Sequence, residues 1–268
     1  MKRLLVAAVA TSFVMITLGE GLHACSTFCI HLGARQFFGR NYDFEIGDAM
    51  VMVNPAGLQK TGFQPAAPRW TARFGSVTFN QFGRDNPMGG MNEAGLVVEL
   101  MWLDATRYPP KDARSPLGVL EWIQYQLDTA ATVGDVLDSD TKVRINGGAP
   151  LHYLVSDRSG RAATVEFLDG KLVAHVDEKL PVPVLTNSTY RESLDYLSSR
   201  RGKAPGGDGS TQRFARAAMQ LHALQASEPE KPVDAIFGVL ENVAQSNTRW
   251  SIVYDQTKRV IYFRTDVH

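Results

Sequence analysis

The chain has little of several features that would point to other classes of protein. It holds only two cysteines, Cys25 and Cys29, among 268 residues, so a fold held by several disulfides is excluded. Its 28 basic and 28 acidic residues cancel, so no basic surplus points to nucleic acid. The sequence contains no HExxH, GxSxG or phosphate-loop motif and no close group of potential metal ligands. We therefore expect no nucleic-acid partner, no metal and no cofactor.

Long hydrophobic runs are also scarce, apart from one at the start. Met1–Arg3 is basic, Leu4–Leu18 is apolar except for small hydroxyl residues, and Glu20–Ala24 is a polar stretch of small residues. This order is typical of a secretory signal, and the apolar run of 15 residues is shorter than the ~20 needed to cross a bilayer. We predict cleavage after Ala24. The product would be a single exported domain of residues 25–268, periplasmic or secreted, with no stable membrane span.

Such cleavage would place a thiol and a free α-amino group on the same residue, Cys25. An α-amino group has a pKa of about 7.7–8 and a cysteine thiol one of about 8.5, so near neutral pH the amine can accept the thiol proton. We expect Cys29 to be a small core residue. A strand over Cys25–Phe28 would separate the two cysteines by about 13 Å, beyond the ~7 Å between Cα atoms that a disulfide spans.

The rest of the chain alternates between groups of strands and groups of helices. Strands are expected over 25–31, 36–44, 76–82, 96–103, 151–156, 162–168, 171–176, 182–185, 250–254 and 259–265. Helices are expected from Ser115-Pro116, from the capping box Thr132–Asp135, from Ser210 and over 233–243. A turn is expected over 91–95, with Gly89-Gly90 as a break in the chain before it. This order favours an α+β fold of antiparallel sheets covered by helices.

Five blocks of sequence, in order, carry a resemblance to a known family. They are Cys25 with 38–45 (FGRNYDFE), 90–96 (GMNEAGL), 184–188 (VLTNS), 212–218 (QRFARAA) and 254–265. Together they resemble the choloylglycine hydrolase and penicillin V acylase family, and most of all its exported Gram-negative branch. The resemblance implies the four-layer αββα sandwich of the N-terminal nucleophile hydrolases. It also implies hydrolysis, without a cofactor, of a linear amide in an N-acyl small molecule such as penicillin V, an acyl-homoserine lactone or a conjugated bile salt.

The same resemblance implies roles for three residues near the new N-terminus. Cys25 would be the nucleophile, and its own amine would carry the proton. Asp43 would hold that amine by a charge-assisted hydrogen bond. Arg40 would lie beside the thiol, where a cation favours the thiolate.

Three more matching residues would support the reacting carbonyl. Asn187 would donate its side-chain NH₂ to the developing oxyanion, and the backbone N–H of Trp102 would be the second donor. Arg213 would support the site electrostatically. From the residues alone, Trp102 fits a core position as well as a pocket wall, and Arg213 fits the surface of a first helical turn. The stretch between Asn187 and Arg213 is shorter than in familiar members of the family, which leaves a homo-oligomer open.

Two other functions compete for Cys25. The segment 22–25 (LHAC) also resembles a lipobox, and lipidation there would produce a membrane-tethered binding protein without catalytic groups. A Cys–His peptidase is the second alternative, since five histidines follow the predicted cleavage site. We expect these histidines at strand ends or on helix surfaces; they are His31, His152, His175, His222 and His268.

Overall fold

Two antiparallel sheets form the centre of the protein. The computed structural model describes residues 24–227 and 229–265, so the predicted signal, apart from Ala24, lies outside the described residues. The five-stranded sheet has the order β14 (Val184–Leu185), β1 (Ser26–Leu32), β2 (Arg35–Asp43), β15 (Thr248–Asp255) and β16 (Val260–Thr265). The seven-stranded sheet has the order β13 (Lys171–Val176), β12 (Ala162–Leu168), β11 (Leu151–Ser156), β8 (Val97–Trp102), β7 (Pro87–Asn92), β6 (Ser76–Asn80) and β3 (Met50–Asn54).

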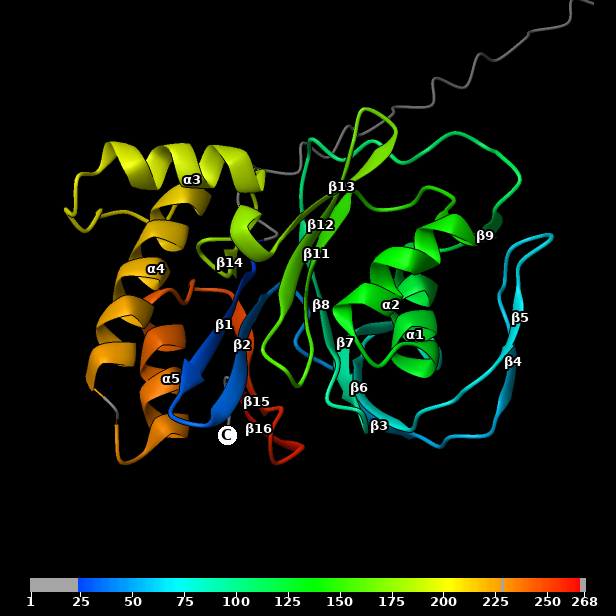
Figure 1. The fold of residues 1–268 in the computed structure, drawn as a ribbon, viewed down its shortest axis with the longest axis horizontal. Helices are drawn as coiled ribbons and strands as arrows, with labels where there is room; N and C mark the ends of the chain where they lie inside the picture. Colours follow the sequence, from blue (N-terminus) through cyan, green and yellow to red (C-terminus); the bar gives the residue numbers. More distant parts are fainter. Residues whose placement is uncertain (1–23, 228, 266–268) are drawn as a thin grey trace, which may run out of the picture.

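Helices cover the outer face of each sheet, which gives the four layers visible in Figure 1. On one side lie α3 (Tyr190–Ser199), α4 (Ser210–Ser227) and α5 (Pro232–Asn242), and on the other lie α1 (Val119–Thr129) and α2 (Val133–Asp138). Smaller elements are the parallel pair β9 (Ser115–Leu117) and β10 (Val143–Ile145), the hairpin of β4 (Gln59–Thr61) and β5 (Arg69–Thr71), and two short 3-10 turns, Ser139–Thr141 and Asp177–Lys179. The expected four-layer αββα sandwich is confirmed. No helix within the described residues is long and apolar enough to cross a membrane.

The hairpin of β1 and β2 is the part of the fold that builds the site. Gly33 takes a positive φ of 59° in its turn, a conformation that glycine adopts without steric cost. The register pairs Ser26 with Asn41, so the start of β1 lies beside the end of β2. Nearly every side chain of both strands is buried, because the hairpin lies between the helices and the second sheet. A buried hairpin without slippage fixes Cys25 relative to the residues that follow Gly39.

Several predicted elements are confirmed. The α2 capping box forms as expected, with the Thr132 hydroxyl accepting from the N–H of Asp135 and the Asp135 carboxylate accepting from the N–H of Thr132. The helix α4 begins at Ser210. Cys29 is buried in β1 as a free thiol, as expected.

Two predictions about local structure are wrong. Ser115-Pro116 does not start a helix, because this segment pairs with the distant strand β10, and α1 begins after Gly118, whose N–H donates to the Glu121 carboxylate at 2.7 Å. Gly89-Gly90 does not break the chain but lies within β7, where an added Cβ on Gly89 would collide with the carboxylate of Glu99. The expected turn itself forms at 92–95, where the N–H of Gly95 donates to the carbonyl oxygen of Asn92. Six further elements were not expected from the sequence: β3, β4, β5, β9, β10 and α3.

The packing of Gly39 gives a test of this hairpin. A Cβ on Gly39 would lie 2.5 Å from Cζ and 2.7 Å from Cε2 of Phe28, which is itself fully buried. We expect Gly39→Ala to lower the free energy of unfolding by about 1–3 kcal/mol, the usual cost of overpacking. Gly238→Ala in α5 is the control, since its Cβ meets nothing within 4 Å and alanine favours a helix by up to ~1 kcal/mol. Urea midpoints measure both, and an unchanged midpoint for Gly39→Ala would contradict the packing.

Candidate active site

Cys25 lies just before β1, with only 4% of its surface exposed. The guanidinium of Arg40 and the backbone of Asp43 both hydrogen-bond to it in a way that favours the ionised thiol. Both residues belong to β2, so the hairpin register brings the three together as predicted. Burial is nevertheless the larger effect, and it raises the pKa of the Cys25 thiol above its ordinary value. The surroundings alone therefore do not ionise this thiol, and a base has to take its proton.

The carboxyl of Asp43 is fully buried next to the thiol. Its Oδ1 accepts a hydrogen bond from the hydroxyl of Thr248 in β15, while its Oδ2 has no hydrogen-bond partner among the described residues. Burial raises the pKa of Asp43 to about 7, although Thr248, Arg213 and Arg40 all favour the carboxylate. An unpartnered buried carboxylate oxygen is costly unless a donor binds it.

Arg213 lies in the first turn of α4 but is buried rather than exposed to solvent. Its Nη1 donates to the carbonyl oxygen of Cys25 at 2.9 Å and to the hydroxyl of Ser26 at 2.6 Å. Its Nη2 donates to Oδ1 of Asn187 at 2.8 Å, and its Nε to the carbonyl oxygen of Asp208 at 3.1 Å. A cation at the positive end of a helix needs such acceptors. The surface alternative for Arg213 is wrong.

Asn187 follows β14 and is held at both ends of its amide. Its Oδ1 accepts from Arg213, and its Nδ2 donates to the carbonyl oxygen of Trp102 at 3.0 Å. Its backbone N–H donates to the hydroxyl of Ser210, the first residue of α4, at 2.8 Å. An amide fixed by two partners has one Nδ2 hydrogen left to offer to a ligand.

A small apolar cavity of about 180 Å³ opens onto the thiol. Its lining is almost entirely hydrophobic: Cys25, Tyr42, Asp43, Phe44, Phe82, Met88, Leu100, Trp102, Val119, Leu120, Ala149 and Leu151. Trp102 is therefore a wall of this cavity, and its indole N–H donates to Asp104 at 2.6 Å. The structure thus places all six predicted site residues around one thiol or its cavity.

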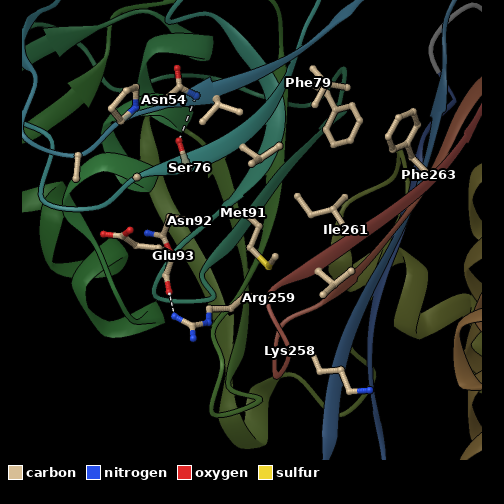
Figure 2. A pocket seen from close by; sticks show the side chains of 17 residues that line it. Asn54, Ser76, Phe79, Met91, Asn92, Glu93, Lys258, Arg259, Ile261 and Phe263 are labelled. Atoms are coloured by element: carbon tan, nitrogen blue, oxygen red, sulfur yellow. Dashed lines mark hydrogen bonds between the residues drawn. The ribbon is translucent and has the colours of Figure 1, made fainter.

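A larger hollow lies elsewhere on the molecule. Figure 2 shows this open groove, which holds about 880 Å³ between one end of the seven-stranded sheet and the β15–β16 hairpin. Apolar side chains such as Val53, Met91, Ile261 and Phe263 line it, together with Glu93 and Arg259. None of the six predicted site residues lines it. The cavity at Cys25 is the better candidate, because an apolar pocket with convergent polar groups and titratable groups of shifted pKa is typical of active sites.

The position of His152 near the start of a strand agrees with expectation, but its burial was not expected. His152 is wholly buried in β11, where its ring contacts the carbonyl oxygen of Thr186 at 2.7 Å and the carboxylate of Glu166 at 3.4 Å. His31 and His222 are exposed, as expected. Arg40 and Asp43, not a histidine, supply the groups that act on the Cys25 thiol. A Cys–His peptidase therefore has no support from the described residues.

The residues that hold the predicted ones in place were not expected from the sequence. Ser26, Thr248 and Ser210 supply hydroxyl groups to Arg213, Asp43 and the backbone of Asn187. Glu99 pairs with Arg40. Serine and threonine carry no distinctive spacing signal, and only the acidic residue within the apolar run 96–103 could have drawn attention. No group of three or more His, Cys, Asp or Glu in the described ranges is arranged to hold a metal ion.

Comparison with known proteins decides the family. Residues 25–267 match the model of the linear amide C–N hydrolases, choloylglycine hydrolase family. The chain belongs to this family. Within it, the match begins at Cys25, and the resemblance stated from the five sequence blocks is confirmed.

Members of the choloylglycine hydrolase family resemble this chain in sequence and in fold. Penicillin V acylase of Pectobacterium atrosepticum is 29% identical over 249 residues, which are 82% of this chain and 66% of that protein, slightly less than two thirds of its length. Penicillin V acylase from Agrobacterium tumefaciens is 30% identical, with a TM-score of 0.80 over 91% of this chain and 84% of its own. A mutant form of conjugated bile acid hydrolase from Clostridium perfringens is 19% identical and has a TM-score of 0.80, over 90% of this chain and 89% of its own. This likeness shows the shared fold.

The raised pKa of Asp43 predicts how the stability of the fold depends on pH. The prediction applies to a chain that carries an N-terminal tag before Ala24, so that Cys25 has no free α-amino group. A carboxyl whose pKa rises from 3.8 in the free group to about 7 in the fold stabilises the fold below the lower value, and loses that contribution as pH rises through about 7. From pH 4 to pH 8 we expect the free energy of unfolding of the parent chain to fall by roughly a few kcal/mol because of Asp43. Asp43→Asn, which has no proton to lose at this position, should not show this part of the fall. Urea unfolding at both pH values measures this. The same pH dependence in both chains would contradict the assignment.

Proposed function

We propose that this protein hydrolyses the amide bond of an N-acyl small molecule through a thioester on Cys25. The observation that carries the proposal is the chain of contacts through Arg213, which joins the carbonyl of Cys25 to the amide of Asn187. This arrangement fixes a nucleophile and an oxyanion donor relative to each other. Membership of a linear amide C–N hydrolase family and similarity to penicillin V acylases support the same reaction.

The reaction begins at the free α-amino group of Cys25. The unprotonated amine takes the thiol proton, and the thiolate attacks the amide carbonyl. The remaining Nδ2 hydrogen of Asn187 and the backbone N–H of Trp102 bind the oxyanion, each donor typically worth about 10²–10³ in rate. The C–N bond then breaks, and the ammonium returns its proton to the leaving amine. Water, activated by the same amine, hydrolyses the thioester and releases the acid.

Processing completes the site. We infer that residues 1–24 are removed as an export signal, so that residues 25–268 work as one domain outside the cytoplasm. The buried Oδ2 of Asp43, which has no hydrogen-bond partner among residues 24–227 and 229–265, is then an acceptor for the new ammonium group. The start of the family match at Cys25 supports this cleavage point.

The cavity favours a compact apolar acyl group. At about 180 Å³, with an aromatic wall formed by Trp102, Tyr42 and Phe82, it suits an aromatic or linear acyl chain better than the rigid rings of a bile acid. The phenoxyacetyl group of penicillin V and a medium alkyl chain of an acyl-homoserine lactone both fit that description. We therefore propose penicillin V and acyl-homoserine lactones as the favoured substrate classes, and conjugated bile salts as a less favoured third class.

Intact mass measures the nucleophile directly. We expect the purified exported protein to begin at Cys25 without modification, and to gain the mass of one phenoxyacetyl group when mixed rapidly with penicillin V. Cys25→Ser should fold normally and lose most of its hydrolytic rate, by at least about 10³, because a serine hydroxyl is a far weaker nucleophile at this pH. Absence of any acyl adduct on the processed chain with every N-acyl substrate tested would refute the proposal.

The chain provides a matched control in its other buried cysteine. Cys29 lies in the same strand-forming segment, and burial raises its pKa to about 12, so it is not a nucleophile near neutral pH. Cys29→Ala should keep the acyl adduct and the rate. A lipid on Cys25 would instead support the membrane-tethered alternative, and an N-terminus at another residue would remove the α-amino group that the proposed reaction needs.

Trp102 gives a test of substrate size. Replacing Trp102, which lines the cavity, by Ala enlarges the cavity and removes an aromatic contact. We expect Trp102→Ala to lower kcat/KM for penicillin V by about tenfold or more, in line with 1–3 kcal/mol for a pocket contact, while glycocholate turnover rises or stays constant. Steady-state kinetics on penicillin V, glycocholate and two acyl-homoserine lactones measure the ratio. A proportional loss on every substrate would show that the ring does not select among them.

A further inference from the structure

A second acidic residue, Glu99 of β8, lies buried behind Arg40. Its Oε2 forms an ion pair with Nη1 of Arg40, and its Oε1 accepts a hydrogen bond from the hydroxyl of Tyr254 in β15. All three side chains are fully buried. The guanidinium of Arg40 therefore lies between two groups that can carry negative charge, the Glu99 carboxylate and the Cys25 thiol.

The other contacts of Arg40 leave it little freedom. Its Nη1 also donates to the carbonyl oxygen of Met88 at 2.9 Å, and its guanidinium lies 4.9 Å from the ring centre of Tyr42. Glu99 is held just as closely, because Gly89 of β7 has no side chain where a Cβ would meet the carboxylate. The place of this cation is thus set by β2, β7, β8 and β15 together, and not by the hairpin alone.

Stability by itself does not account for such a pair. Taking two charges out of water costs several kcal/mol each, and a buried ion pair is often no more stabilising than apolar residues of the same volume. Glu99 also does not line the cavity at the thiol, so it is not placed to touch a substrate. What it does touch is the cation that acts on the nucleophile.

We propose that Glu99 is a positioning residue, which fixes the guanidinium of Arg40 against the sulfur of Cys25 and limits how much of its positive charge the sulfur feels. The two anions share one cation, so the ionisation of either weakens its hold on the other. Removing the charge of Glu99 while keeping its shape should therefore make the thiol more acidic.

The groups that face Glu99 are consistent with a coupling near neutral pH. They are Arg40 from β2 and Tyr254 from β15, whose hydrogen bonds favour the carboxylate, whereas burial opposes it and raises the pKa of Glu99 to about 7. The facing position on β7 is a glycine and adds no charge. Glu99 is consequently ionised over the range in which a cysteine thiol titrates, and its charge is present when the thiolate forms.

The test is the pH profile of Cys25 alkylation by iodoacetamide, in processed protein with Cys29→Ala so that one thiol remains. We expect Glu99→Gln to move the profile to lower pH by about one unit, the order of a nearby unit charge in a protein interior. Glu99→Asp keeps the charge and should leave the profile close to its original place. A merely structural role predicts the same profile in both variants.

A matched control separates this effect from loss of a buried ion pair in general. Asp255 at the end of β15 is also buried and pairs with Arg35 at the start of β2, both in the five-stranded sheet and at the end of β2 away from Arg40. Asp255→Asn should lower the unfolding midpoint, as Glu99→Gln does, but should not move the alkylation profile. A shift of equal size in Asp255→Asn would overturn the proposal.

Tyr254→Phe keeps the experiment decisive if Glu99→Gln fails to fold. Without the hydroxyl donor the carboxyl is protonated over more of the pH range, so the profile should move in the same direction by a smaller amount. An unchanged profile in whichever of these two variants folds would refute the role of Glu99.

The proposal rests on Cys25 being the reactive group of the proposed hydrolase. Alkylation needs no substrate, however, so failure to cleave any amide and failure of this coupling would be seen separately.

Discussion

Two buried cations, one on each side of Cys25, are the constraint on which the site depends. A guanidinium removed from water is tolerated only where fixed acceptors surround it. Arg213 meets this need by binding Cys25, Ser26 and Asn187, which ties helix α4 to the start of β1 and to the loop after β14. Arg40 meets it through Met88 and Glu99, which ties β2 to the second sheet. Cys25, the proposed nucleophile, lies where these two sets of contacts meet.

The same burial explains why the proposed reaction needs a base on Cys25 itself. Desolvation outweighs the help from Arg40, and the thiol keeps a raised pKa. A distant general base would have to enter a cavity whose lining is almost wholly apolar. An α-amino group on the same residue needs no space of its own, and its pKa of about 7.7–8 suits proton transfer near neutral pH. Burial of the thiol and the proposed N-terminal position of Cys25 are therefore consistent with each other.

Sequence patterns predicted what depends on neighbours along the chain or on family motifs. The hairpin of β1 and β2, the α2 capping box and the six site residues were predicted in this way. Contacts between the two sheets were not, because no periodicity shows which residue of one sheet faces which of the other. Glu99 is a single acid in an otherwise apolar strand, and Gly89-Gly90 was expected to break the chain; the ion pair with Arg40 explains the first, and the pairing of Gly89 with Glu99 explains the second.

The side-chain amide of Asn187, the proposed oxyanion donor, is held in place by the protein alone. Arg213 and the carbonyl of Trp102 hold the two ends of the Asn187 amide. The residue before it is held as well, since the carbonyl of Thr186 contacts the ring of buried His152, whose other nitrogen faces Glu166. A donor held in this way needs no reorientation as negative charge develops, and this preorganisation is the source of electrostatic catalysis in acyl transfer. The buried histidine thus supports the backbone next to the proposed donor, and it is not one of the groups that act on the Cys25 thiol.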